Sequence, residues 1–152
     1  MPDAAEPISK ERLRLWLRVL KTSRMIESRL RDNLRSEFGT TLPRFDVMAA
    51  LSRFPDGLKM SQLSGVLRVS NGNVTGVVDR LADDGFVVRV AVTGDRRASL
   101  VQLTPKGYQE FAAQAGAHET WIDDMLTEFD LDDLGAIGAR FEALMTSLEG
   151  KD

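Results

Sequence analysis

The N-terminal part of the chain has an apolar residue at every third or fourth position over residues 10–38, the spacing of one face of an α-helix. The positions on this face are Leu13, Trp16, Leu17, Leu20, Ile26, Leu30, Leu34 and Phe38. Ser9 lies where an N-cap is expected, and Gly39 follows as an expected C-terminal stop. The pattern predicts one long helix.

The next part of the chain has three shorter helical patterns. Pro43 suits the first turn of a helix, and turn residues at 55–57 end that segment. The residues expected to be buried there are Phe45, Val47, Met48, Leu51 and Phe54. A second pattern covers residues 61–67, a break is expected at 68–70, and a third pattern runs to Asp84. Short helices joined by so tight a turn predict a helix-turn-helix.

After Gly85 the period changes from helical to strand-like. Residues 86–92 are rich in β-branched side chains, residues 93–95 have turn chemistry, and residues 98–103 alternate well enough to return as a second strand. The simplest product is a β-hairpin.

Two further helices are expected after the hairpin. Thr104 and Pro105 suit the N-cap and first position of a helix that runs to about Phe129. Its apolar seam has a coiled-coil-like spacing and consists of Phe111, Ala115, His118, Ile122, Met125 and Phe129. A last helix repeats this pattern with Leu131, Leu134, Ile137, Phe141, Leu144 and Leu148. Both ends of the chain thus have apolar stripes too broad for one small domain to cover, which predicts a partner.

Composition narrows the chemistry that the chain can support. It has 152 residues, no cysteine and one histidine, so a disulfide scaffold, a cysteine nucleophile and a zinc site with sulfur ligands are excluded. We expect neither a metal nor another cofactor. Because there is no G-x-S-x-G motif, phosphate-binding loop or histidine pair, we expect no enzyme. The chain has no apolar signal region or long apolar run, so we expect a cytoplasmic protein without membrane association.

Charge is unevenly distributed, although the net charge is only -3. Residues 9–44 hold ten Lys/Arg against four Asp/Glu, residues 59–108 hold seven against four, and residues 109–152 hold two against eleven. The positive middle segment suits nucleic acid, and the acidic segment would have to lie away from it. Ordinary solvated helix faces are the alternative interpretation.

A helical wheel separates two faces of the segment at 71–84. The face expected to pack on the core holds Val74, Val77, Val78 and Leu81. The opposite face holds Gly72, Gly76, Asp79 and Asp83, flanked by Asn73, Thr75 and Arg80. Glycines there either let a DNA backbone approach closely or only mark a weak helix start. We expect Ser70 to cap this helix and Arg80, or an arginine of the hairpin, to neutralise Asp79.

Several motifs occur together around the hairpin. It contains Asp95-Arg96-Arg97, followed after five residues by Leu103-Thr104-Pro105-Lys106-Gly107. Upstream lie Val74-Thr75, Asp79-Arg80-Leu81 and Gly85-Phe86-Val87-Val88-Arg89. These motifs, with the order of the elements, resemble the MarR family of winged helix-turn-helix regulators over roughly residues 10–148.

The resemblance implies a mainly α fold with a small β-hairpin wing, between N- and C-terminal dimerisation helices. It places a disordered tail at 1–8, a dimerisation helix at 9–40, the DNA-binding module at 41–104 and the C-terminal dimerisation helices at 105–149. A homodimer of this kind presents two recognition helices to a pseudo-palindromic operator in double-stranded DNA. A winged-helix adaptor that binds proteins and not DNA is the alternative.

The resemblance also implies site residues. Those expected to bind DNA are Ser70, Asn71, Asn73, Thr75, Arg80, Asp95, Arg96 and Arg97. Within this set, Arg97 would enter the minor groove and Asp95 would orient the wing loop.

MarR-like proteins commonly bind a small aromatic or anionic effector that releases a repressor from DNA. The candidate effector contacts here are Trp16, Arg29, Arg44 and His118, although a core or solvated role is open for each. The run at 41–46 is similar to that of members responding to hydroxycinnamate-type acids or their coenzyme A thioesters.

Overall fold

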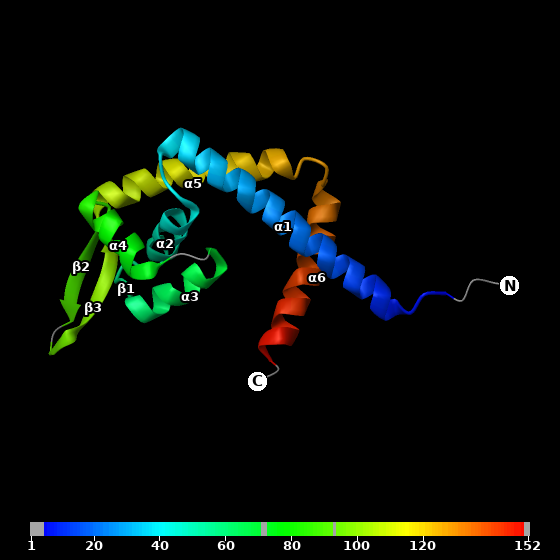
Figure 1. Cartoon of the computed structure of the whole chain (residues 1–152), viewed down its shortest axis with the longest axis horizontal. Helices are drawn as coiled ribbons and strands as arrows, with labels where there is room; N and C mark the ends of the chain where they lie inside the picture. Colours follow the sequence, from blue (N-terminus) through cyan, green and yellow to red (C-terminus); the bar gives the residue numbers. More distant parts are fainter. Residues whose placement is uncertain (1–4, 71–72, 93, 151–152) are drawn as a thin grey trace. The chain divides into compact units, whose positions relative to one another are not determined.

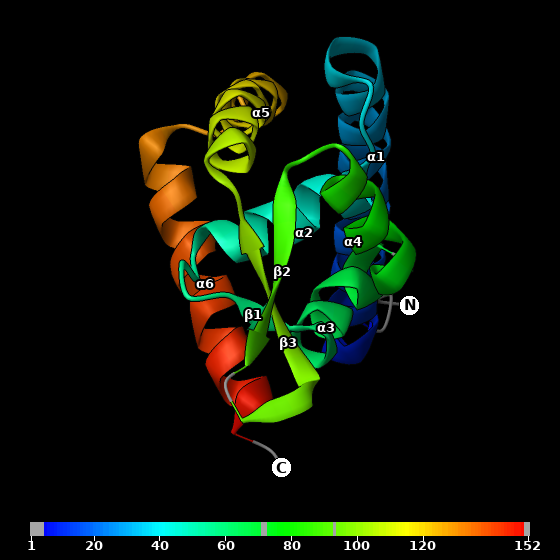
Figure 2. The ribbon, with the colours of Figure 1, turned by 90° about the vertical axis from the view of Figure 1, so that its left-hand side faces the viewer.

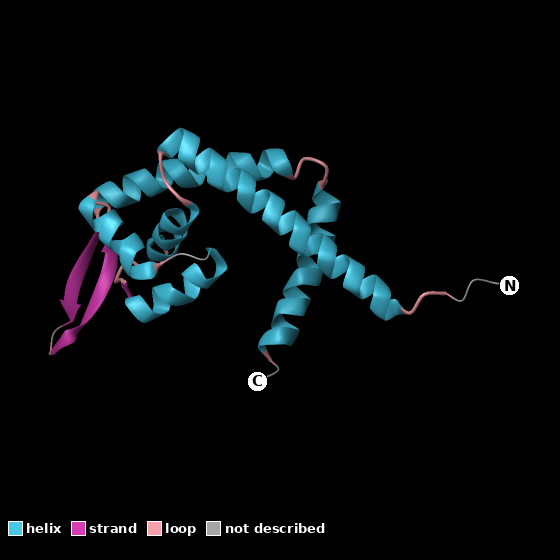
Figure 3. Ribbon diagram, viewed as in Figure 1, coloured by secondary structure: helices cyan, strands magenta, loops and turns pink. Residues whose placement is uncertain are grey.

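A computed structural model describes residues 5–70, 73–92 and 94–150 of the chain. It is mainly helical with a small antiparallel sheet, as the sequence predicts (Figures 1 and 3). The elements are α1 (Ile8–Phe38), α2 (Leu42–Ser52), β1 (Leu58–Lys59), α3 (Met60–Ser70), α4 (Val74–Asp83), β2 (Val87–Val92), β3 (Asp95–Leu103), α5 (Pro105–Met125) and α6 (Leu131–Glu149). The chain forms two compact units, one ending at His118 and the other beginning at Glu119.

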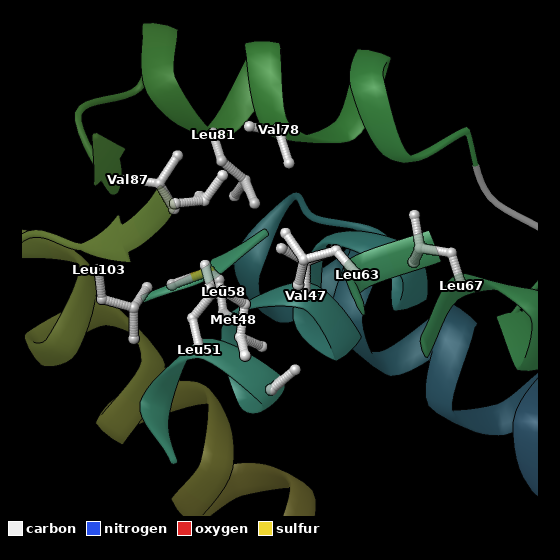
Figure 4. Packing of buried hydrophobic residues seen from close by; sticks show 12 residues of the cluster. Val47, Met48, Leu51, Leu58, Leu63, Leu67, Val78, Leu81, Val87 and Leu103 are labelled. Carbon is white, nitrogen blue, oxygen red and sulfur yellow. The ribbon is translucent and has the colours of Figure 1, made fainter. Parts of the chain in front are cut away.

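The core of the first unit lies between α2, α3, α4 and the sheet (Figure 4). Its fully or almost fully buried side chains include Val47, Met48, Leu51, Leu63, Leu67, Val78, Leu81, Val87 and Val101. Burying a side chain of this size stabilises the fold by about 1.5–3 kcal/mol. The expected inner face of α4 is confirmed, because Val78 and Leu81 are buried while Val74 and Val77 pack at the edge of the same cluster. The core therefore fixes which face of α4 points outward.

The sheet has three strands in the order β1-β3-β2, all antiparallel (Figure 2). The expected hairpin pairs Val87 with Leu103 and Arg89 with Val101, and its register shifts beside Val92 near the tip. A third strand, β1, is not predicted from the sequence, and its Leu58 pairs with Val101. A two-residue strand has no period from which it could be recognised.

The N-terminal helix begins earlier than expected. It starts at Ile8 after Pro7, which lies in the cap position without a capping side-chain bond, so the expectation of Ser9 as N-cap is wrong. The expected tail at 1–8 is too long by that residue, and positions 1–4 lie outside the described residues. Gly39 ends the helix with a positive φ of 60°, as expected of a C-terminal glycine.

The helix-turn-helix differs in two details from the prediction. Residues 68–70 continue α3, so the break expected there is wrong. Asn73, not Ser70, is the N-cap of α4, and its side chain accepts a hydrogen bond from the backbone N–H of Gly76 at 3.2 Å. Both residue types cap helices well, so sequence alone could not choose between them. Gly72 lies outside the described residues.

Two apolar expectations are also corrected. Phe54 follows the end of α2 and is 51% exposed, so it does not belong to the core. The helix that begins after Thr104 ends at Met125 and does not reach Phe129. Asp130 and Asp133 form a capping box that begins α6, and an N-cap residue cannot continue the preceding helix.

Among the described helices, none combines the length and apolar character needed to cross a membrane.

Candidate nucleic-acid interface

The outward face of α4 presents polar side chains to solvent. Asn73, Thr75 and Arg80 are all exposed, while the inner side of the same helix is anchored in the core. A Cβ at Gly76 would meet the Asn73 side chain at 3.7 Å, an ordinary contact, so nothing among the described residues requires glycine there. Residues that can donate and accept hydrogen bonds thus flank the outward face of α4, an arrangement that suits a groove of DNA.

The remaining predicted DNA contacts precede α4 in the sequence or belong to the hairpin. Ser70 is the last residue of α3, and Asn71 lies outside the described residues. The backbone of Asp95, Arg96 and Arg97 forms the first residues of β3, at the hairpin tip beside Gly94. Strand β2 of this hairpin contacts α4, so the hairpin lies beside the helix as a wing lies beside a recognition helix.

An ion pair joins the wing to α4. The Arg89 Nη2 on β2 lies 2.6 Å from the Asp79 Oδ1, and both side chains are more than a third exposed. The partner of Asp79 is therefore an arginine of the hairpin and not Arg80, two possibilities that the sequence analysis left open. Within the described residues Arg80 has no ion-pair partner, so its cation remains available to a ligand.

The turn between α4 and β2 is held from two other helices. The Arg44 guanidinium on α2 pairs with the Asp84 carboxylate, and the Lys106 Nζ on α5 donates to the Asp84 carbonyl at 2.7 Å. The Thr104 hydroxyl donates to the carbonyl of Gly85 at 2.6 Å. The sequence analysis had named no role for Asp84 or Lys106. The L-T-x-x-G motif was the available signal, because its Thr104 also caps α5.

A cavity of about 430 Å³ adjoins this turn. It is lined by Phe38, Gly39, Thr40, Arg44, Met48, Asp83, Asp84, Phe86, Lys106, Glu110 and Gln114. Two buried polar atoms on this lining, the Arg44 Nε and the Gln114 Oε1, have no hydrogen-bond partner among the described residues. The Gln114 side chain is almost completely buried. Unsatisfied buried polar groups are costly, so an acceptor placed near the Arg44 Nε and a donor placed near the Gln114 Oε1 would be stabilising.

The four candidate effector residues are not brought together. Arg44 lines the cavity, and His118 stacks on the neighbouring Phe45 with ring centroids 4.8 Å apart. Burial lowers the pKa of His118 below its usual value, which favours the neutral imidazole. Trp16 and Arg29 are exposed on α1 and do not line the cavity. The sequence analysis missed Gln114, because a glutamine among alanines gives no functional signal.

Comparison with known proteins agrees with this arrangement. Residues 38–98 match the model of the MarR family. The HTH-type transcriptional regulator PecS of Dickeya dadantii is 29% identical over 107 residues, a match that covers 69% of this chain and 64% of PecS. PecS and the other curated relatives that the chain matches are transcriptional regulators and not enzymes.

Solved structures extend the likeness to almost the whole chain. A MarR family transcriptional regulator from Silicibacter pomeroyi is 34% identical, with a TM-score of 0.78, and the match covers 94% of this chain and 99% of that one. Sco3205 from Streptomyces coelicolor, solved in complex with DNA, has the same fold at 18% identity and a TM-score of 0.76, over 98% of this chain and 94% of its own. The chain therefore belongs to the MarR family of transcriptional regulators.

Proposed function

We propose that the protein is a homodimeric, cytoplasmic repressor that binds a specific DNA sequence and is released by a small aromatic or anionic effector. The observation that carries this proposal is the exposed polar face of α4, fixed by the core on its other side and flanked by a wing. Sco3205, which has the same fold, is solved in complex with DNA, and this supports a DNA-binding role for the chain.

DNA reading would be divided between helix and wing. Asn73, Thr75 and Arg80 would contact base edges and nearby phosphates in the major groove, because their side chains are exposed along α4. Ser70 and Asn71 would add phosphate contacts before that helix. At the wing tip, Arg96 and Arg97 would reach the minor groove, with Asp95 orienting the loop.

A second copy of the chain would cover the apolar surface of the terminal helices. On α1 the exposed apolar side chains are Ile8, Leu13, Leu15, Trp16, Leu17 and Met25, each at least 52% exposed. On α6 they are Leu131, Leu134, Ile137, Phe141, Leu144, Met145 and Leu148, each at least 40% exposed. Soluble proteins rarely expose this many large apolar side chains outside an interface. A twofold dimer would hold two α4 helices against a pseudo-palindromic operator.

The cavity beside the α4–β2 turn would receive the effector. An aromatic ring suits Phe38, Met48 and Phe86, and a ligand acceptor and donor would satisfy the Arg44 Nε and the Gln114 Oε1. A ligand carboxylate would also compete with Asp84 for the Arg44 guanidinium, which would loosen the exit of α4. His118 would act through Phe45, and Trp16 and Arg29 would contribute only where a second copy brings its α1 to the site.

Selection of bound fragments from sheared genomic DNA, followed by gel-shift assays, tests the proposal. We expect one recurring pseudo-palindrome, bound far more tightly than a scrambled duplex, and released by members of a panel of benzoates, cinnamates and coenzyme A thioesters. Arg44→Ala should raise the effector concentration needed for release. A folded dimer that enriches no DNA sequence would contradict the proposal and favour the protein-interaction adaptor.

A further inference from the structure

The outward face of α4 carries two carboxylates where the proposed DNA would lie. Asp79 and Asp83 are both exposed, one helical turn apart. A carboxylate facing a phosphate backbone is repulsive unless a cation neutralises it. Only Asp79 of these two has an ion-pair partner among the described residues, and that partner is Arg89.

The sheet register explains how Arg89 reaches this position. Arg89 pairs directly opposite the buried Val101 and stands two residues after the buried Val87, so all three lie on the face of the sheet that packs against the helices. The arginine stem runs out from the edge of the core, and its guanidinium meets the Asp79 carboxylate at 2.6 Å. The pair therefore links the wing to the recognition helix at its DNA-facing side.

We propose that Asp79 is a specificity-determining residue. Its carboxylate pairs with the Arg89 guanidinium in place of a DNA phosphate, so this cation is not available to DNA of arbitrary sequence. This inference rests on the proposed DNA-binding function. Binding to arbitrary DNA depends on phosphate neutralisation alone, so a cation that is already neutralised adds little to it. Exposed ion pairs are weak, so a closely docked operator phosphate can take Arg89 from Asp79 at small cost.

The proposal predicts different salt dependences for the two kinds of DNA. In Asp79→Asn, Arg89 is free for any phosphate, so the slope of log K against log salt on scrambled DNA should steepen by about 0.9. The ratio of variant to wild-type affinity on that DNA should then change about 3.5-fold between 50 and 200 mM salt. On operator DNA the slope should not change, because Arg89 contacts a phosphate in both proteins. The specificity ratio of the variant should therefore fall.

A double-mutant cycle separates this role from a general charge effect. The proteins are wild type, Asp79→Asn, Arg89→Gln, the double variant, and Asp83→Asn as a matched control that removes the same charge without an ion pair. In the Arg89→Gln background Asp79→Asn should change binding to scrambled DNA only as much as Asp83→Asn does, because each then removes one unpaired carboxylate. In the wild-type background the effect of Asp79→Asn should be larger, because it also frees Arg89. Arg89→Gln alone should flatten the operator slope by about 0.9. On scrambled DNA it should leave the slope nearly unchanged and weaken binding only through the repulsion between the unpaired Asp79 and phosphates. Thermal melting confirms folding, and Asp79→Ser repeats the test with a different side chain.

Two results would overturn the inference. One is a change in slope with Asp79→Asn that is equal on operator and scrambled DNA, or absent on both. The other is an effect of Asp79→Asn on scrambled DNA that is no larger in the wild-type background than in the Arg89→Gln background. If the wild-type protein prefers a sequence but shows either result, only the inference fails. If the wild type prefers no DNA sequence, the proposed function fails and the inference falls with it.

Discussion

Replacing Gly107 by alanine should damage the junction between α4, the wing and α5. Gly107 is in the first turn of α5, and a Cβ there would lie 2.0 Å from the carbonyl oxygen of Phe86 and 3.1 Å from Leu103 Cδ2. The same carbonyl accepts a hydrogen bond from the backbone N–H of Thr104 at 3.0 Å. Since the obstacle is backbone and not a side chain that could rotate, the two segments must separate by more than 1 Å, roughly the overlap beyond normal packing distance.

The expected cost follows from these contacts. Overpacking a tight site costs about 1–3 kcal/mol, and loss of the Thr104 hydrogen bond adds about 1 kcal/mol. Alanine gains up to about 1 kcal/mol over glycine as a helix former, which offsets only part of this. We therefore expect Gly107→Ala to lower the free energy of unfolding by about 3 kcal/mol, a large part of the roughly 5–15 kcal/mol of an ordinary domain.

Urea denaturation followed by far-UV circular dichroism measures this loss. All proteins should be compared at one concentration, because dimerisation contributes to apparent stability. Gly65→Ala is the matched control, since Gly65 is an exposed helical glycine of α3 whose added Cβ would have no neighbour within 4 Å. The control should be neutral or more stable by up to about 1 kcal/mol. A Gly107→Ala protein with the wild-type urea midpoint would refute the packing argument.

Three further predictions concern association, recognition and pH. Light scattering should give a dimer for the full chain, and removal of residues 130–152 should abolish both the dimer and operator binding; a truncated monomer with full operator affinity would contradict this. Arg97→Ala should weaken binding to all DNA and flatten its salt dependence, whereas Asn73→Ala or Thr75→Ala should cost about 1–3 kcal/mol of discrimination between operator and mutated operator; equal losses on both DNAs would refute the division. Because burial lowers the pKa of His118 below 6.5, the unfolded chain takes up the proton first, so stability should fall as pH drops below about 6.5. In urea titrations at several pH values, His118→Phe should reduce this fall in the free energy of unfolding. A variant with the same pH dependence as wild type would contradict the role of His118.

Periodicity predicted most of the fold, because long helices and an alternating hairpin repeat their pattern many times. Periodicity failed where a single residue determines at which position a helix begins or ends. Ser70 and Asn73 are both good caps, and only the structure shows that Asn73 begins α4. The apolar seam continues to Phe129 although α5 ends at Met125, so the seam did not indicate where the helix ends.

The candidate site was predicted less completely than the fold. A helical wheel gives the direction of each side chain on α4 but not what reaches it from another element. It therefore placed Asp79 outward without choosing Arg89 as its partner. Arg44 and Asp84 are 40 positions apart, so no local sequence pattern could predict their ion pair. Gln114 becomes a candidate contact only because the structure places it on the lining of the cavity.

The central claim is that two α4 helices of one dimer read a symmetric DNA site. Hydroxyl-radical and methylation footprinting of a fragment selected from genomic DNA tests it most directly. We expect two symmetric half-sites with major-groove protection, centred about one helical turn of DNA apart, each flanked by minor-groove protection from a wing. Arg97→Ala should remove the flanking protection and leave the central protection in place. Uniform protection without symmetry, or none on any selected fragment, would contradict the claim.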